Sequence, residues 1–148
     1  MELIIIGTNP PCPRCDKTYL MAEEIVKESG AECIIRQLEL NTEEAKAIAD
    51  SLGHHIGTTR EITELTGETV DRKLFADAVL RASERTGEDP RPADLWIPDF
   101  DKALDNVVKA AEKVGYYVTP VILKDGELVW HGSVPAEEDL KRWIKGNI

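Results

Sequence analysis

The sequence has few cysteines and no long apolar run. Its 148 residues include only three cysteines, too few to build a disulfide framework. The apolar run near the start of the chain, Leu3 to Ile6, follows Glu2 and spans only four residues. That is far shorter than the apolar region of a signal peptide or a membrane span. From these features we expect a cytoplasmic protein.

The sequence also lacks an excess of positive charge. It has 18 basic and 28 acidic side chains, which gives a formal net charge of −10. Such a charge repels phosphate backbones and anionic lipids, so we expect neither nucleic acid nor a membrane surface as a partner. The length predicts one domain, and the 42% hydrophobic content is ordinary for a globular protein.

Two of the cysteines, Cys12 and Cys15, lie where a predicted strand and turn lead into a predicted helix. The turn residues run from Gly7 to Pro11, and the helix is predicted to continue to Ser29. Pro13 fits the first helical position, where no intrahelical N–H bond is lost. The first N–H groups of a helix have no intrahelical partner and carry partial positive charge, so they stabilise a thiolate at Cys12. This pattern indicates a redox dithiol in which Cys12 attacks and Cys15 resolves.

Other side chains allow more than one interpretation. Arg14 is either a cation that stabilises the thiolate or a solvated residue at the helix start. The dithiol could instead be half of a zinc site, which Cys33 and a histidine would have to complete. We favour a packing role for Cys33 in a buried strand. We expect His54 and His55 in a solvated loop, and His131 at an exposed sheet edge.

The remaining periodicity alternates between strands and helices near both ends of the chain. The predicted elements are strands over 33–40, 116–123 and 127–131, a helix that residues 41–44 cap and that runs to about Leu52, a helix over 101–114, and a closing helix around 140–144. Asp125-Gly126 predicts a tight hairpin turn between the last two strands. This order predicts an α/β fold in which the first two strands form a parallel pair.

Between residues 53 and 101 the periodicity is weak, and we predict a mainly helical insert. Residues 58–61 fit the start of a short helical turn, a second helix is predicted from 69–71 to Arg85, and a loop over 87–92. Trp96 and Phe100 are predicted to dock the insert onto the core. A structureless loop of this length is unusual, so we expect the insert to pack near the dithiol and to select its partner.

Two stretches of sequence together carry a resemblance to a known family. The first is the β-α-β-α order with Cys-Pro-x-Cys after the first strand, and the second is the segment from Ala111 to Ile144, in which Thr119-Pro120 precedes a hairpin and a final helix. In these features the chain resembles the thioredoxin and glutaredoxin superfamily over about residues 1–52 and 102–148. The resemblance implies an α/β, thioredoxin-like three-layer fold: a central four-stranded mixed sheet flanked by helices. The whole chain, 1–148, would be one such domain with the helical insert at about 53–101.

The resemblance also implies roles for the residues around Pro120. It implies that Pro120 follows a cis peptide bond beside the dithiol and that Thr119 offers backbone groups to an extended substrate. We therefore expect substrate contacts from Pro13, Arg14, Thr119 and Pro120. We expect no metal, and no cofactor beyond the redox-active pair of cysteines.

The resulting hypothesis is a thiol-disulfide oxidoreductase that serves electron transport. We expect a monomer that acts on a protein disulfide and is restored by a separate electron donor, either a reductase or a low-molecular-weight thiol. The alternative is a binding module with the same fold. In that case the Cys12 and Cys15 pair would hold a soft metal or metalloid, or the fold would dock a partner enzyme without turnover.

Overall fold

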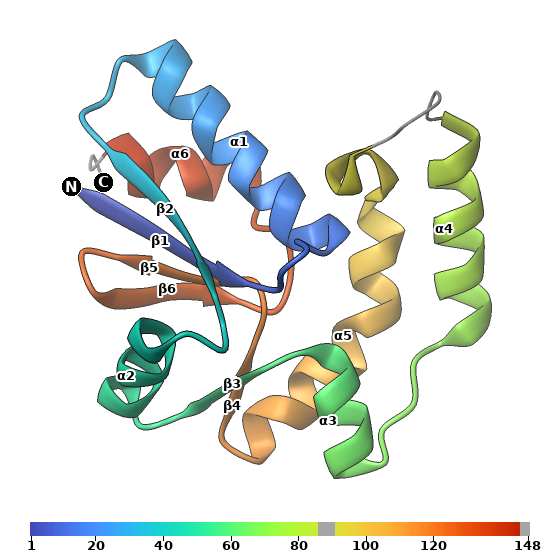
Figure 1. Ribbon diagram of the computed structural model, residues 1–148. Helices are drawn as coiled ribbons and strands as arrows, with labels where there is room; N and C mark the ends of the chain where they lie inside the picture. The colour runs from blue at the N-terminus through green and yellow to red at the C-terminus, as the bar shows by residue number, and fades with distance from the viewer. Residues whose placement is uncertain (86–90, 146–148) are drawn as a thin grey trace.

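The structure, a computed structural model, describes residues 1–85 and 91–145, and it is an α/β fold (Figure 1). The strands are β1 Glu2–Gly7, β2 Ile34–Glu39, β3 His55–Gly57, β4 Tyr116–Val118, β5 Val121–Lys124 and β6 Glu127–His131. The helices are α1 Pro13–Ser29, α2 Glu43–Leu52, α3 Thr59–Thr66, α4 Arg72–Arg85, α5 Pro98–Lys113 and α6 Glu137–Lys145, with a short 3-10 helix, η1, at Pro92–Leu95. None of the helices in this described part has the length and apolar character needed to cross a membrane.

A mixed four-stranded sheet lies at the centre, in the order β2-β1-β5-β6. The predicted parallel pair is confirmed, because β1 pairs in parallel with β2; β5 is antiparallel to both β1 and β6. Alternate residues of β1 face opposite sides of the sheet. Leu3 and Ile5 pack in the core that includes α1 and α6, whereas Ile4 and Ile6 pack with residues of α2. Because both faces of β1 are buried, its residues from Leu3 to Ile6 are all apolar instead of alternating with polar ones.

Helices therefore cover both faces of the sheet, as Figure 1 shows, with α1 and α6 on one side and α2 on the other. Local sequence sets where these helices begin and end. The Thr42 side chain accepts a hydrogen bond from the Ala45 backbone N–H at the start of α2. Gly30 ends α1 with a φ of 66°, a left-handed conformation that glycine adopts without steric cost.

The single strand predicted over 116–123 is wrong, because the structure has two strands there in two different sheets. β4 ends at Val118 and pairs in parallel with β3, whereas β5 begins at Val121 in the central sheet. The Thr119–Pro120 peptide between them is cis, as expected. Pro120 has no backbone N–H to give to a ladder, which fits the break between strands. The partner strand β3 has only three residues and too little periodicity to be predicted.

The segment predicted as an insert is mainly helical, but it also contains strand β3. Thr58 and Glu61 form a capping box at the start of α3, where a short helical turn was predicted. The second predicted helix of this segment is α4, which begins at Arg72. Helix α5 begins at Pro98, three residues before its predicted start at 101. Most of the predicted 87–92 loop lies outside the described residues, but Pro92 opens η1.

The insert has a core of its own. Phe75 of α4 and Phe100 of α5 pack with ring centroids 4.9 Å apart, and Trp96 packs against the same cluster. The predicted docking residues thus join the insert's own helices rather than the core of the central sheet. In Figure 1, α3, α4 and α5 gather beyond the end of the sheet where β1 leads into α1. This arrangement places the insert next to the CxxC motif.

Candidate active site

Cys12 caps the N-terminus of α1, as the sequence predicted. Its sulfur accepts a hydrogen bond from the Cys15 backbone N–H, with a sulfur-to-nitrogen distance of 3.4 Å. Pro13 follows at the first helical position. The Thr8 hydroxyl accepts from the Cys12 N–H at 3.0 Å and donates to the Pro10 carbonyl at 2.9 Å. The turn before the helix is therefore held by one side chain, which fixes the position of Cys12.

Cys15 lies one helical turn further in and is buried, with 3% of its surface exposed. Its sulfur is 3.0 Å from the Cys12 sulfur. Gly7, the last residue of β1, permits this placement. A Cβ atom at Gly7 would lie only 2.8 Å from the Cys15 sulfur, so the close approach of β1 and α1 requires glycine here.

The pKa values of the two thiols are shifted in opposite directions from that of a free cysteine. The pKa of Cys12 is lowered from 9.0 to about 6, chiefly because the Cys15 thiol donates a hydrogen bond to its thiolate. Burial opposes this shift, while the Cys15 backbone N–H and the charge of Arg14 support it. The pKa of Cys15 is raised far above its usual range, first by that same hydrogen bond and then by burial. Near neutral pH the pair therefore holds one thiolate, on the accessible cysteine, and one proton, on the shielded one.

Arg14 is buried, so the alternative of a solvated residue at the helix start is wrong. Only 3% of it is exposed. Its guanidinium donates to the Thr119 carbonyl at 3.0 Å and to the Gly132 carbonyl, and it lies 3.6 Å from a carboxylate oxygen of Asp101. Arg14 thus ties the start of α1 to the segment before Pro120, to the end of β6 and to the first turns of α5.

Asp101 is the buried acidic partner of this arginine. Its Oδ2 atom accepts from the Trp96 indole N–H at 2.9 Å and from the Val134 backbone N–H at 3.1 Å. Its Oδ1 atom is buried and has no hydrogen-bond partner among the residues that the structure describes. Burial raises the pKa of this carboxyl, and the nearby Arg14 charge opposes the rise. Because a buried charge needs a partner, Asp101 and Arg14 depend on each other.

A second ion pair fastens the insert to α1. Asp16 is buried, and both of its carboxylate oxygens accept from the Arg91 guanidinium, at 2.8 and 2.9 Å. The Ala93 backbone N–H also donates to Asp16, at 2.9 Å. These contacts keep the pKa of Asp16 below its usual value, the hydrogen bonds from Arg91 being the main cause. The residue after Cys15 therefore positions the start of η1.

Thr119 and Pro120 are buried beside Arg14, and the backbone of Thr119 is already engaged within the chain. The Thr119 N–H donates to the Gly57 carbonyl at 3.0 Å, which continues the β3–β4 pairing, and its carbonyl accepts from Arg14. Both groups that the resemblance assigns to an extended substrate thus have partners inside the protein.

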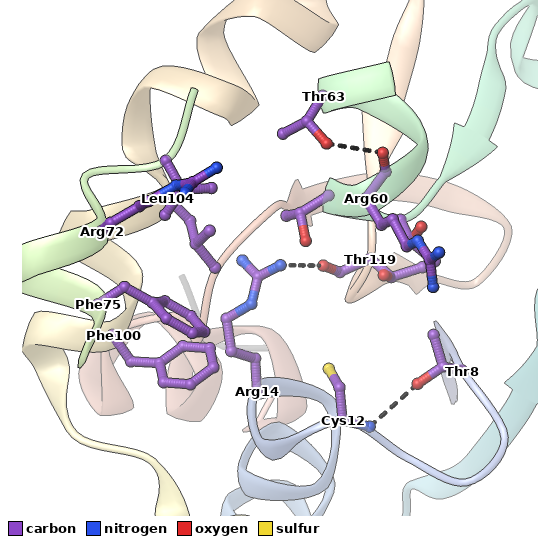
Figure 2. Close-up of a pocket in the computed structure, with 13 residues that line it drawn as sticks. Thr8, Cys12, Arg14, Arg60, Thr63, Arg72, Phe75, Phe100, Leu104 and Thr119 are labelled. Carbon is purple, nitrogen blue, oxygen red and sulfur yellow. Dashed lines mark hydrogen bonds between the residues drawn. The ribbon is translucent and has the colours of Figure 1, made fainter. Parts of the chain in front are cut away.

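A cavity of about 400 Å³ opens beside Cys12 (Figure 2). Its lining brings together three of the predicted site residues, Cys12, Arg14 and Thr119, whereas Pro13, Cys15 and Pro120 do not line it. In Figure 2 the Cys12 sulfur points toward the space between Arg14 and Arg60. The cavity is thus open to the predicted nucleophile and not to the predicted resolving thiol.

Most of the cavity wall comes from the insert, which sequence reasoning left without site residues. Apolar side chains form one side, and they are Val70, Phe75, Phe100 and Leu104. Of the lining residues, three are arginines, Arg14, Arg60 and Arg72, and none is acidic. The only sequence signal was arginine near the start of two predicted helices, at Arg60 and Arg72. The sequence did not show where these helices lie relative to Cys12, so neither arginine could be assigned to the site before the fold was known.

The remaining candidate residues lie elsewhere. Cys33 directly precedes β2 and is half-buried; it packs against the core cluster that contains Leu3 and Ile25, which confirms the predicted packing role, and burial raises its pKa. The strand itself is not buried as predicted, because the residues of β2 are half-buried or exposed. His55 begins β3, contrary to its predicted place in a loop, and His54 stacks on Tyr117 with ring centroids 4.3 Å apart. His131 was predicted to be exposed, but only 12% of its side chain is.

His131 has a structural role at the junction of the two sheets. Its Nδ1 atom accepts from the Val118 backbone N–H at 3.0 Å, and burial lowers its pKa. In the described part of the chain, no group of three or more histidine, cysteine or acidic side chains is arranged to hold a metal ion.

Comparisons with known proteins do not extend these observations. No protein-family model, no curated protein sequence and no solved structure matches the chain. The site is therefore defined by its own geometry: a thiolate-forming Cys12 and a shielded Cys15 at a helix N-terminus, beside a cavity lined by apolar side chains and arginines.

Proposed function

We propose that the protein is a thiol-disulfide oxidoreductase with a thioredoxin-like fold. The observation that carries this proposal is the 3.0 Å approach of the Cys12 sulfur, whose pKa is lowered to about 6, to the sulfur of the buried Cys15. A thiolate is the attacking species in disulfide exchange, and a neighbouring thiol is needed to resolve the product. The layout agrees with the proposal, because a CxxC follows β1 and a cis proline precedes the β5–β6 hairpin and α6.

The reaction takes place in two exchanges. The Cys12 thiolate attacks one sulfur of a substrate disulfide, forming a mixed disulfide and releasing the other half as a thiolate. Cys15 then loses its proton and attacks the Cys12 sulfur, which releases the second half and closes the Cys12–Cys15 disulfide. The substrate gains two electrons and the cysteine pair loses two. A low-molecular-weight thiol or a reductase returns these electrons in the next cycle.

Trapping the intermediate tests this scheme. Reduced protein is mixed with insulin or with 2-hydroxyethyl disulfide, and its disulfides are identified by mass spectrometry. We expect Cys15→Ser to accumulate a mixed disulfide at Cys12, because the resolving thiol is absent. We expect Cys12→Ser to form none, and Cys33→Ser to behave as the wild type.

Two outcomes would contradict the proposal. Full disulfide reductase activity in both Cys12→Ser and Cys15→Ser would refute the two-step scheme. If the wild type instead reduced neither disulfide but bound zinc or arsenite with loss of both thiols, the alternative of a binding module would hold. Titration of the reduced protein with each ion, followed by thiol counting, decides between them.

A further inference from the structure

The cavity beside Cys12 has a chemical character that the rest of the chain does not share. The chain carries a net charge of −10, yet the lining includes three arginines and no acidic residue. Arg14 is already engaged with backbone carbonyls and Asp101, so it is not available as a ligand. Arg60 and Arg72 are exposed at the rim, in the first turns of α3 and α4. Two exposed cations therefore line the same cavity as the nucleophile.

The charges of these two arginines are paired weakly or not at all with other described side chains. In the part of the chain that the structure describes, the Arg60 guanidinium forms one ion pair, an exposed one with Glu64 at 3.4 Å and one helical turn away, and pairs of this kind contribute little. Within the described residues, no ion pair or side-chain hydrogen bond involves the Arg72 guanidinium. A bound anion could therefore contact either guanidinium without breaking a strong ion pair.

Apolar side chains line much of the same cavity. Phe75, Phe100 and Leu104 come from α4 and α5, and Val70 comes from the segment before α4. Figure 2 shows Phe75 and Phe100 on one side of Arg14, with Arg60 on the other side. Arg72 lies on the same side as the two phenylalanines, beside Leu104. The volume of about 400 Å³ lies within the range of cavities that hold small molecules. The cavity thus offers an apolar surface and two cations within reach of one thiolate.

The backbone near Cys12 argues against an extended peptide as the occupant. A peptide that adds to a strand needs N–H and C=O groups that have no partner. The Thr119 N–H is used by Gly57, and the Thr119 carbonyl by Arg14. Recognition at this site must therefore come mainly from side chains, and these surround a compact volume.

We propose that the cavity selects low-molecular-weight disulfides in which an apolar, ring-sized arm carries a carboxylate, with the arm held by Phe75, Phe100 and Leu104 and the carboxylate by one of the two rim arginines, Arg60 or Arg72. This inference rests on the proposed function, because it names the substrate class of the same dithiol. The held half stays on Cys12 as the mixed disulfide, while the other half leaves as a thiolate. Attack by Cys15 then frees the held half, and the electron balance is that of the two exchanges given above.

The test compares three disulfides that differ in charge or in the apolar arm. They are the disulfides of 4-mercaptobenzoate, of the neutral 4-mercaptobenzamide and of 3-mercaptopropionate, which has a carboxylate but no ring. Single-turnover rate constants are measured with pre-reduced protein, so no recycling reductant is needed. Each variant is compared with the wild type on the same disulfide, which cancels the intrinsic reactivity of the reagents.

Paired variants separate charge from shape. Arg60→Gln/Arg72→Gln should slow the benzoate disulfide about threefold, the effect of one partly exposed ion pair, and leave the benzamide disulfide unchanged. The control Lys46→Gln/Lys73→Gln removes the same charge from exposed residues outside the cavity and should change neither. Thr63→Phe fills the cavity from α3 and should slow both ring-bearing disulfides while sparing that of 3-mercaptopropionate.

A binding measurement keeps this inference separate from the catalytic proposal. Calorimetry with the Cys12→Ser/Cys15→Ser protein should show binding of the benzoate disulfide, and loss of that binding when Arg60→Gln/Arg72→Gln is added. If the wild type reduces all three disulfides but Arg60→Gln/Arg72→Gln changes the rates of the acid and the amide by the same factor, the substrate class is wrong and the oxidoreductase proposal stands. The substrate class is also wrong if insulin reacts faster than the benzoate disulfide and Thr63→Phe leaves the insulin rate unchanged. If Cys12 attacks no disulfide at all, the proposed function falls, and the calorimetry then shows whether the cavity still binds the acid.

Discussion

Replacing Cys15 by alanine should raise the pKa of Cys12, because it removes the main cause of the lowered value. The Cys15 thiol lies 3.0 Å from the Cys12 sulfur and donates to its thiolate. A hydrogen bond to a charged group contributes about 1.5–3 kcal/mol, and one pKa unit corresponds to about 1.4 kcal/mol. The expected rise is therefore about one to two units. The backbone N–H of residue 15 and the charge of Arg14 remain, so the pKa should stay below that of a free thiol.

The rate of alkylation by iodoacetamide measures this shift, since only the thiolate reacts. In the wild type, Cys12 should be half-maximally reactive near pH 6, the value set by its pKa of about 6. A rise of about 1.5 units would slow the reaction about eightfold at pH 6.5 and change it little at pH 9. Mass spectrometry after quenching assigns the label to Cys12, and a Cys33→Ser background removes the third thiol.

Cys15→Ser is the matched control, because its hydroxyl retains a donor at the same position. Both variants lack the resolving thiol, so they differ mainly in whether residue 15 can donate a hydrogen bond. We expect the pH profile of Cys15→Ser to stay close to that of the wild type. The reasoning is refuted if Cys15→Ala also keeps its midpoint near pH 6, or if Cys15 is labelled before Cys12 in the wild type at neutral pH.

Three further predictions concern the residues that hold the site. Gly7→Ala places a Cβ about 2.8 Å from the Cys15 sulfur; it should destabilise the protein by about 1–3 kcal/mol in urea unfolding and raise the pKa of Cys12 by displacing that thiol. Arg14→Met leaves Asp101 and two buried carbonyls without their partner and should cost about 3–5 kcal/mol, whereas a merely solvated arginine would cost almost nothing. His131 has a lowered pKa and so binds fewer protons in the folded than in the unfolded protein; stability of the oxidised protein should therefore fall as pH drops below about 6.5, and His131→Asn should abolish that slope.

The sequence predicted the structure correctly where a pattern of neighbouring residues determines it. The apolar run of β1, the place of Cys12 at the start of α1 and the end of α1 at Ser29 each depend on neighbouring residues, and each was predicted correctly. The cis bond before Pro120 is also present, although it came from a family resemblance rather than from periodicity. Local signals therefore placed the dithiol without any knowledge of the tertiary fold.

The rest of the site depends on contacts between segments far apart in the sequence. The role of Arg14 stayed open between a cation that stabilises the thiolate and a solvated residue, because nothing nearby in the chain shows that Thr119 and Gly132 meet its side chain. His131 looked like an edge residue because Val118, its hydrogen-bond donor, belongs to a strand in the other sheet. No periodicity carries such information, since each contact exists only after the two sheets have formed.

The insert is also bound to the site more closely than its weak sequence pattern suggests. It supplies Gly57 to pair with Thr119, Asp101 of the following helix faces Arg14, and Arg91 holds Asp16 beside Cys15. Each contact joins the insert or its boundary to a residue within one helical turn of the dithiol or next to Pro120. Removing residues 53–98 would therefore expose backbone and charged groups that are now buried, in addition to opening the cavity. Substrate selection and positioning of the dithiol thus depend on the same segment, so point changes at its rim, such as Arg60 and Arg72, can separate the two roles where a deletion cannot.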